Sequence, residues 1–154
     1  MKEVYYIRHN WEFSGPADFC RKKKYVGMHW KNKSSVKPSE YDDLGKRAFE
    51  RLYKALKSGA LVCADYPAEN GKRDKRYMLI GKLDVNKSVF SEKVKCLEGP
   101  TWWLKCARLE KPLMLPYSSH PSLLSRRPTR GTIMKWPSMK QYVNRIVKNG
   151  HRSK

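Results

Sequence analysis

The sequence predicts an α+β domain built around a curved sheet or small β-barrel that is flanked by helices. The chain has 154 residues, a length that suits one domain with a substantial core. Hydrophobic residues make up 40% of it, which fits a folded protein rather than a disordered basic tail. Its short apolar runs and its two main amphipathic stretches do not alternate regularly, which argues against a doubly wound parallel sheet.

The expected strands are short runs of β-branched, aromatic and aliphatic residues between turn residues. Between Pro112 and Pro137 the chain is rich in proline, so we expect mostly extended loop there with one short strand. An aromatic-rich piece at 25–30 follows a basic cluster at 21–24, and Gly15 with Pro16 predicts a loop before that cluster. The expected strands cover residues 4–7, 59–64, 77–83, 94–97, 102–109 and 131–136.

Two helices are expected from apolar residues at helical spacing. Ser39 with Asp42 resembles a capping box, and the helical pattern that follows runs until Gly59. Ser138 is the expected cap of a final helix that ends near Gly150. We therefore expect a single domain over residues 1–150, followed by a basic tail at 151–154.

The charge pattern points to a polyanionic partner. The chain holds 34 Lys and Arg against 14 Asp and Glu, a net charge of +20. After Glu110 there is no acidic residue up to the last position. Phosphates relieve the repulsion among such cations and release condensed counterions. A merely solubilising surface usually mixes both signs of charge, and a thermophilic source is another interpretation of the many lysines.

The cysteines and the hydropathy exclude several classes. Four scattered cysteines form no C-x-x-C pair, so we expect no zinc site, no other metal and no cofactor. Cys63 and Cys106 lie in apolar stretches and are expected in the core. No apolar stretch is long enough to cross a bilayer, and no signal peptide opens the chain. We expect a cytoplasmic protein without a membrane partner.

Signals of catalysis are weak, so we expect no enzymatic activity in this domain. None of the four histidines lies in a known catalytic motif, and no glycine-rich phosphate loop is present. The alternative is a small metal-dependent nuclease or RNA-modifying enzyme that uses Asp65 and Asp84.

Aromatic residues among basic ones are the stronger signal, because exposed indole rings provide stacking platforms for bases. The five tryptophans come from four separate segments of the chain, several of them beside Lys or Arg. Trp102 and Trp103 are adjacent on an expected strand, so one should point into the core and the other outward. Trp30 and the outward member of this pair are the best candidates for contact with a base.

Several short segments together resemble the PUA-like superfamily, especially its EVE and YTH branches. The segments are Val4–Ile7, Gly27–Trp30, Cys63–Tyr66, Met78–Leu83 and Arg130–Ile133. The resemblance implies a small curved sheet flanked by helices that holds a modified base in an aromatic pocket. Related domains read DNA in archaeal McrBC-type restriction systems, which implies an AAA+ motor domain and a nuclease subunit as partners.

The resemblance also implies roles for particular residues. Trp30 matches the cage aromatic after the first strand, Trp103 matches the aromatic after Gly99-Pro100, and Asp65 or Tyr66 matches a polar pocket residue. No complete cage of three aromatic residues can be placed, and the loop at 117–130 has no counterpart in the family. The candidate binding residues, from both lines of argument, are Trp30, Trp103, Trp102, Tyr66, Asp65, His29, Arg126, Arg127, Arg130 and Lys135.

The basic loop supplies the expected phosphate contacts. Arg126, Arg127 and Arg130 lie among Ser and Pro, where no helical spacing pairs them with acids, so we expect them to be free for phosphate. The leading prediction is a non-enzymatic module that recognises a modified, methylated base, with DNA preferred over RNA, within a restriction or defence system. The alternative binding function is a PUA-like RNA reader.

Overall fold

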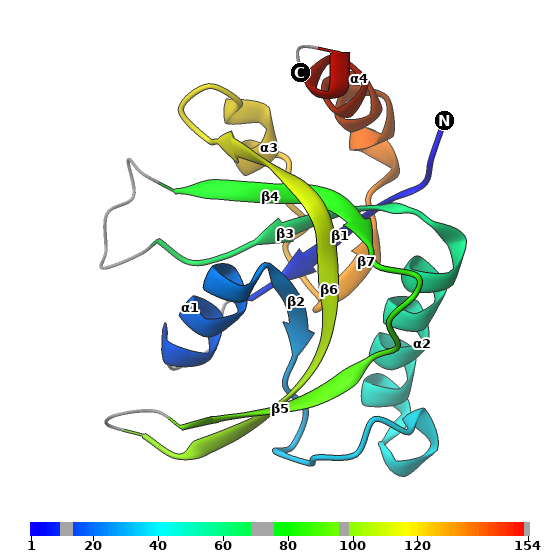
Figure 1. Cartoon of the computed structure of the whole chain (residues 1–154), viewed down its shortest axis with the longest axis vertical. Helices are drawn as coiled ribbons and strands as arrows, with labels where there is room; N and C mark the ends of the chain where they lie inside the picture. Colours follow the sequence, from blue (N-terminus) through cyan, green and yellow to red (C-terminus); the bar gives the residue numbers. More distant parts are fainter. Residues whose placement is uncertain (10–13, 69–75, 96–98, 153–154) are drawn as a thin grey trace.

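The structure, a computed structural model, describes residues 1–9, 14–68, 76–95 and 99–152. It confirms an α+β fold whose mixed sheet is strongly curled and flanked by helices (Figure 1). The strands are β1 (Val4–Arg8), β2 (Tyr25–Met28), β3 (Leu61–Asp65), β4 (Tyr77–Leu83), β5 (Phe90–Lys95), β6 (Thr101–Pro116) and β7 (Ile133–Lys135). The helices are α1 (Ser14–Lys23), α2 (Asp43–Ser58), α3 (Pro121–Ser125) and α4 (Lys140–Arg152), with 3₁₀ turns η1 (Pro38–Glu40) and η4 (Pro137–Met139).

The sheet has the strand order β2-β6-β4-β3-β1-β7, and β5 pairs with the first half of β6 on the edge opposite β2. Strands β1 and β3 are parallel, and the other pairs are antiparallel. The long strand β6 pairs with β5 and β2 in its first half and with β4 in its second half. The β4–β6 register shifts between Ile80 and Lys82, opposite Lys111 with φ 41°. Such a bulge bends a strand, so β6 carries the sheet around its curl.

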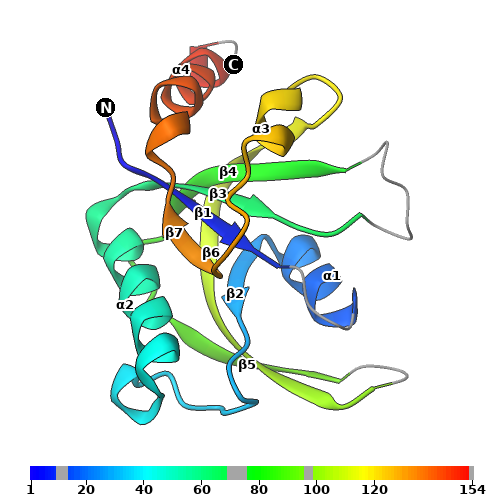
Figure 2. The same cartoon turned by 180° about the vertical axis from the view of Figure 1, so that it is seen from behind.

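Two hydrophobic clusters lie on the two faces of the sheet. Strand β1 contributes to both, because its side chains alternate: Tyr5 and Ile7 pack in the larger cluster, and Val4 and Tyr6 in the smaller one. Helix α2 buries one apolar face in the larger cluster, and Val143 of α4 packs in the smaller one. Figures 1 and 2 show α3 and α4 at one end of the molecule and β5 at the other, with α1 and α2 on opposite sides.

The expected helix α2 is confirmed, with a corrected start. Asp42 is its N-cap and accepts a hydrogen bond from the Gly45 N–H at 3.0 Å, whereas Ser39 belongs to η1. Asp42 is the better cap because its negatively charged carboxylate also interacts favourably with the positive end of the helix dipole. Gly59 ends the helix in the left-handed region with φ 67°, where a residue without Cβ avoids strain.

Two other expectations are corrected. The segment around Gly15 and Pro16 is not a loop but the start of α1, because proline is well tolerated in the first turn of a helix. Ser138 is not a helix cap but lies inside η4, and α4 begins after it and runs to Arg152. Cys63 and Cys106 are buried as expected. Of the remaining cysteines, Cys20 is buried too, and Cys96 lies outside the described residues.

Candidate nucleic-acid interface

Asp65, at the end of β3, is a buried carboxylate that accepts hydrogen bonds from four side chains. Its Oδ2 accepts hydrogen bonds from the Tyr6 hydroxyl at 2.5 Å and from the Arg127 guanidinium at 2.8 Å. Its Oδ1 accepts from the Tyr117 hydroxyl at 2.5 Å and from the Arg76 guanidinium at 2.9 Å. Only 2% of the Asp65 surface is exposed. The carboxylate therefore joins β1, β3, the start of β4, the end of β6 and the segment after α3.

These four donors hold Asp65 in its ionised form. Burial alone would raise its pKa, but the hydrogen bonds from Tyr117 and Tyr6 and the charge of Arg76 outweigh burial and lower the pKa below its ordinary value. Burial and the neighbouring carboxylate conversely raise the pKa of Tyr6 to about 12. A buried charge in such a setting is stabilising only as long as all of its partners remain.

His9 extends this polar group toward β2. Its Nδ1–H donates to the Asp65 carbonyl oxygen at 2.9 Å, and its Nε2 accepts from the Gly27 N–H at 2.9 Å. The ring stacks on Tyr66 with centroids 4.4 Å apart. Burial lowers the pKa of His9 to about 4, so the ring is neutral at neutral pH. His9 and Tyr66 thus connect β1, β3 and β2 inside the fold.

A small polar recess opens above Asp65. It has a volume of about 350 Å³ and lies between the end of β1 and the segment after α3. Arg8 closes one side, because its guanidinium donates to the carbonyl oxygens of Pro128 and of Thr129, the latter at 3.2 Å. Arg127 is half-buried in its wall and is held by Asp65. Two guanidinium groups therefore border this recess, both already engaged by acceptors of the protein.

The aromatic residues gather at the opposite end of the molecule, where β2 meets the start of β6. Trp102 is buried and stacks on His29 with centroids 3.9 Å apart. The Trp103 side chain is half-buried on the other face of β6, which confirms that the two indoles diverge. The ammonium group of Lys93 lies over the Trp103 ring, 5.6 Å from its centroid. His29 Nδ1 lies 3.3 Å from the Trp103 carbonyl oxygen, and burial lowers the His29 pKa.

Trp30 packs against the start of α2. Its Nε1–H donates to Asp42 Oδ1 at 2.9 Å, and its ring lies so close to Gly45 that a Cβ there would come within 2.6 Å of Nε1. One side of the Trp30 ring is therefore covered by the helix. The remaining area of this half-buried side chain is the part that a ligand could reach.

Lys105 is a buried cation in the same region. Its Nζ donates to the carbonyl oxygens of Lys33 and of Trp103, the latter at 3.2 Å, and lies 5.5 Å from the centroid of the Tyr41 ring. Burial lowers the pKa of Lys105 to about 8. No ion pair joins it to a carboxylate among the described residues, so backbone oxygens and a ring face supply its stabilisation.

The arginines of the basic loop fall into two groups. Arg126 and Arg130 are exposed, as is Lys135 on β7. Arg127 is not free, which corrects the prediction for this residue. Local spacing could not reveal its partner, because Asp65 lies 62 positions away in the sequence. The structure thus brings Asp65 and Arg127 together. Tyr66, next to Asp65 in the chain, stacks on His9, and the other aromatic candidates, Trp30, Trp102, Trp103 and His29, lie elsewhere.

The role expected for Asp65 as a polar pocket residue does not fit this geometry, because both of its oxygens already accept two hydrogen bonds. Sequence reasoning also missed its partners Tyr6, Arg76 and Tyr117. One signal could have indicated such a cluster: a carboxylate at the end of an otherwise apolar buried strand must be paired. That signal predicts that hydrogen-bond donors surround the carboxylate, but it does not predict which residues supply them.

Asp65 and Asp84 are the residues of the alternative nuclease prediction. Within residues 1–9, 14–68, 76–95 and 99–152, no three His, Cys, Asp or Glu side chains are placed to hold a metal ion together. Asp84 instead accepts a hydrogen bond from the Asn86 N–H at 3.0 Å, in the turn after β4.

The chain matches no protein-family model, no curated protein and no solved structure. In the described part of the chain, no helix has the length and apolar character needed to cross a membrane.

Proposed function

We propose that this chain is a non-enzymatic nucleic-acid-binding module that recognises a modified base, with DNA as its preferred target, within a restriction or defence system. The observation that carries the proposal is the surplus of positive charge. Five ion pairs are formed among the described residues, in a chain with 34 Lys and Arg. Most of the Lys and Arg side chains in the described ranges lie outside these five ion pairs, which is the setting in which phosphates bind.

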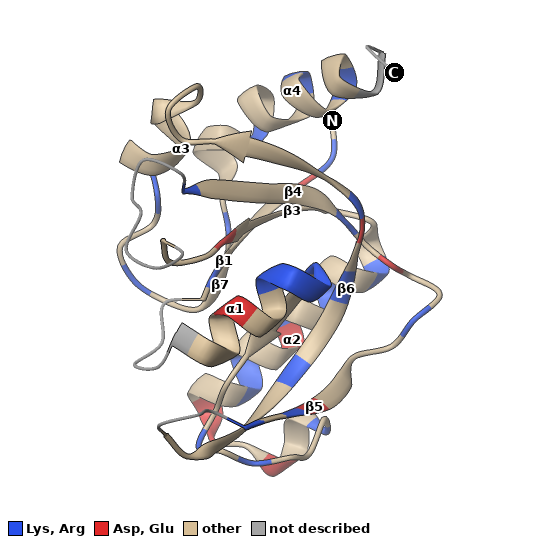
Figure 3. Cartoon of the chain, turned by 60° about the vertical axis from the view of Figure 1, so that its left-hand side comes forward, with Lys and Arg blue, Asp and Glu red and all other residues tan. Residues whose placement is uncertain are grey.

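The cations lie on several surfaces that a strand of nucleic acid could follow. Lys22 and Lys23 are exposed in the last turn of α1, where Figure 3 shows a blue block beside the sheet. Arg21 of the same turn is buried and pairs with Asp18 at 3.0 Å. Arg126 and Arg130 are exposed between α3 and β7. Contacts of this kind hold the backbone in place without reading sequence.

Trp103 is the residue that best suits contact with a base. Its ring is half-buried, so a face or edge remains accessible, and the Lys93 ammonium beside it adds positive charge for a neighbouring phosphate. Asn32 fixes the backbone at this point, since its Oδ1 accepts from the Trp103 N–H at 2.8 Å. Stacking of a base on an aromatic ring contributes about 1–3 kcal/mol. A methyl group on the base adds apolar area, and its burial against such a ring strengthens binding by about 0.8 kcal/mol.

The proposal is tested by titrating matched methylated and unmodified oligonucleotides, as DNA and as RNA, over a series of salt concentrations. We expect a slope of log affinity against log salt on the order of −4 to −8, for about five to nine phosphates of duplex. If the affinity for oligonucleotides does not change with salt concentration, the positive charge of the chain does not bind phosphates. Tighter binding of the RNA set than of the DNA set would favour the RNA reader.

Base recognition is tested with Trp103→Ala and Trp30→Ala, each with a melting curve. We expect the folded variants to lose their preference for the modified base while keeping the salt-dependent component. Met114→Ala is a matched control, because it truncates an exposed apolar side chain on the same strand β6, away from the aromatic residues. If both tryptophan variants fold and still prefer the modified base, the reader assignment fails.

A further inference from the structure

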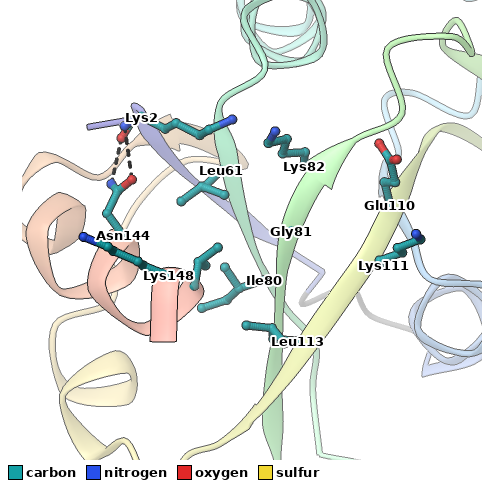
Figure 4. Close-up of a pocket in the computed structure, with 11 residues that line it drawn as sticks. Lys2, Leu61, Ile80, Gly81, Lys82, Glu110, Lys111, Leu113, Asn144 and Lys148 are labelled. Carbon is teal, nitrogen blue, oxygen red and sulfur yellow. Dashed lines mark hydrogen bonds between the residues drawn. The ribbon is translucent and has the colours of Figure 1, made fainter. Parts of the chain in front are cut away.

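A second recess lies between α4 and strands β3, β4 and β6, and none of its lining residues belongs to the region of Trp30, Trp102 and Trp103. Its volume is about 380 Å³, within the ~300–1,000 Å³ typical of small-molecule sites. Its floor is aliphatic, formed by Leu61, Ile80, Leu113 and Val147 (Figure 4). An apolar floor of this kind suits the uncharged part of a small ligand.

Positive charge borders this floor. Lys2, Lys82, Lys111 and Lys148 line the recess, and Glu110 is the single carboxylate among its lining residues. No ion pair joins Glu110 to any of these lysines within the described parts of the chain. The recess therefore combines an apolar floor with an unbalanced cationic rim.

Two of the ammonium groups converge. In Figure 4 the side chains of Lys2 and Lys82 reach toward each other above Leu61. Contact with Lys82, then burial and then charge repulsion lower the pKa of Lys2. Two like charges in contact are unfavourable in the absence of an anion, and an anion placed between them removes the repulsion.

The backbone fixes both walls of the recess. The Asn144 side chain of α4 accepts from the Lys2 N–H at 3.1 Å and donates to the Lys2 carbonyl oxygen at 2.9 Å. On the other side, the bulge in β6 adds Lys111 to the rim with φ 41°, a conformation that is strained for a residue with a side chain. Strained residues of this kind gather at binding sites.

We propose that this recess binds an organic phosphate of nucleotide size, with the phosphate between Lys2 and Lys82 and the nucleoside part on the aliphatic floor. A phosphate suits this rim better than a carboxylate does, for two reasons. A phosphomonoester carries up to two negative charges to match the surplus of lysines, and lysine binds phosphate as a point charge, whereas carboxylates are more often held by the paired N–H groups of arginine. The site does not depend on the proposed function, since it shares no residue with the aromatic region.

Two sources share this chemistry: a free mononucleotide and the phosphorylated end of a strand. The experiment follows the methyl NMR signals of Ile80 and Leu113 during titration. The probes are adenosine monophosphate, adenosine, inorganic phosphate, hexanoate, and a short oligonucleotide with or without a 5′-phosphate. We expect adenosine monophosphate to shift these signals and to bind about tenfold or more tightly than phosphate or adenosine alone, because only it uses both rim and floor. A shift by the 5′-phosphorylated oligonucleotide, and not by its unphosphorylated form, identifies a strand end as the source, whereas a shift by the mononucleotide alone identifies the free nucleotide.

Lys82→Gln and Lys2→Gln should each weaken binding of adenosine monophosphate by about tenfold, since each removes one charged donor. Lys46→Gln is the matched control, because it removes the same charge from an exposed position on α2. The proposal is overturned if adenosine monophosphate leaves both methyl signals unmoved, if hexanoate binds more tightly than the nucleotide, or if Lys82→Gln binds as the control does. Loss of modified-base preference in the tryptophan variants would leave all these results unchanged, so the two proposals fail separately.

Discussion

Asp65 and Lys105 are a buried anion and a buried cation that the same fold stabilises in different ways. Asp65 accepts hydrogen bonds from two hydroxyl groups and two guanidinium groups. Among the described residues, Lys105 contacts backbone carbonyl oxygens and the face of Tyr41. The pKa of Asp65 is lowered, which favours its charged form, and the pKa of Lys105 is lowered to about 8, which disfavours its charged form.

The difference follows from the composition of the chain. The chain has 34 basic and 14 acidic residues, so many cations are available to pair with a buried carboxylate. Few carboxylates are available to pair with a buried ammonium group. The region of Asp65 is therefore closed by its own ionic partners. In the region of Lys105, no carboxylate among the described residues forms an ion pair with the ammonium group. The half-buried Trp103 lies in the same region. This is why we place the proposed contact with a base at Trp103 rather than at Asp65.

Asp65→Asn should have the largest effect on stability. The amide keeps the shape but leaves Arg76 and Arg127 without their counter-ion, so we expect a loss of about 3–5 kcal/mol in the free energy of unfolding, measured with denaturant. Asp84→Asn is the control, because Asp84 caps an exposed turn by a hydrogen bond that an amide oxygen also accepts. Equal stability of the two variants would mean that the Asp65 cluster is not the structural centre described here.

Trp102→Ala and Trp103→Ala compare the two faces of β6. Trp102 is 7% exposed and stacks on His29, so its truncation should lower the free energy of unfolding by about 3 kcal/mol. Trp103→Ala should lower it by about 1 kcal/mol, because much of that ring already contacts solvent. Chemical denaturation of both variants measures the difference, and the reverse order would contradict the assignment of Trp102 to the core.

Arg127→Ala and Arg126→Ala separate structure from binding in the basic loop. Loss of the hydrogen bond between Arg127 and Asp65 should lower the free energy of unfolding by about 2 kcal/mol. Arg126→Ala should leave stability unchanged within about 0.5 kcal/mol but reduce the salt slope of oligonucleotide binding by about 1. Thermal melts together with salt titrations provide both readouts. A stable Arg127→Ala variant would show that Arg76 suffices to neutralise Asp65.

Lys105→Met should have the smallest effect and the opposite sign. An apolar side chain of similar length removes a buried ammonium group, so we expect stability to stay the same or rise by about 1 kcal/mol. The wild-type protein has a second signature. The folded state releases the Lys105 proton near pH 8, whereas an unfolded lysine holds its proton to about 10.5, so this group makes stability rise with pH in that window.

Unfolding curves at several pH values from about 7 to about 10 measure this contribution as the difference between the wild-type protein and Lys105→Met. The wild-type protein should gain stability relative to Lys105→Met as the pH rises, because the wild-type lysine becomes neutral in the folded state. A constant gap over the whole range would mean that Lys105 keeps its ordinary pKa in the fold.

Local patterns were enough to predict most elements of this fold. The segment at 77–83 is β4, and the apolar spacing before Gly59 is α2. The divergence of Trp102 and Trp103 follows from the two-residue repeat of a strand. Helix α1 was missed because Gly15 and Pro16 favour a turn in most contexts, and only the packing of Ala17 and Cys20 in the core favours a helix there.

The sequence by itself determined which faces are apolar, how strongly basic the chain is, and which aromatic residues stand beside cations. Only the tertiary structure decided which charges meet. The partners of Asp65 lie 11, 52, 59 and 62 positions away along the chain, and those of Lys105 include the carbonyl oxygen of Lys33, 72 positions away. Periodicity shows the side of an element on which a residue lies. It does not show the strand register or the loop path that brings a distant donor to that residue, because these depend on how the whole sheet pairs and curls.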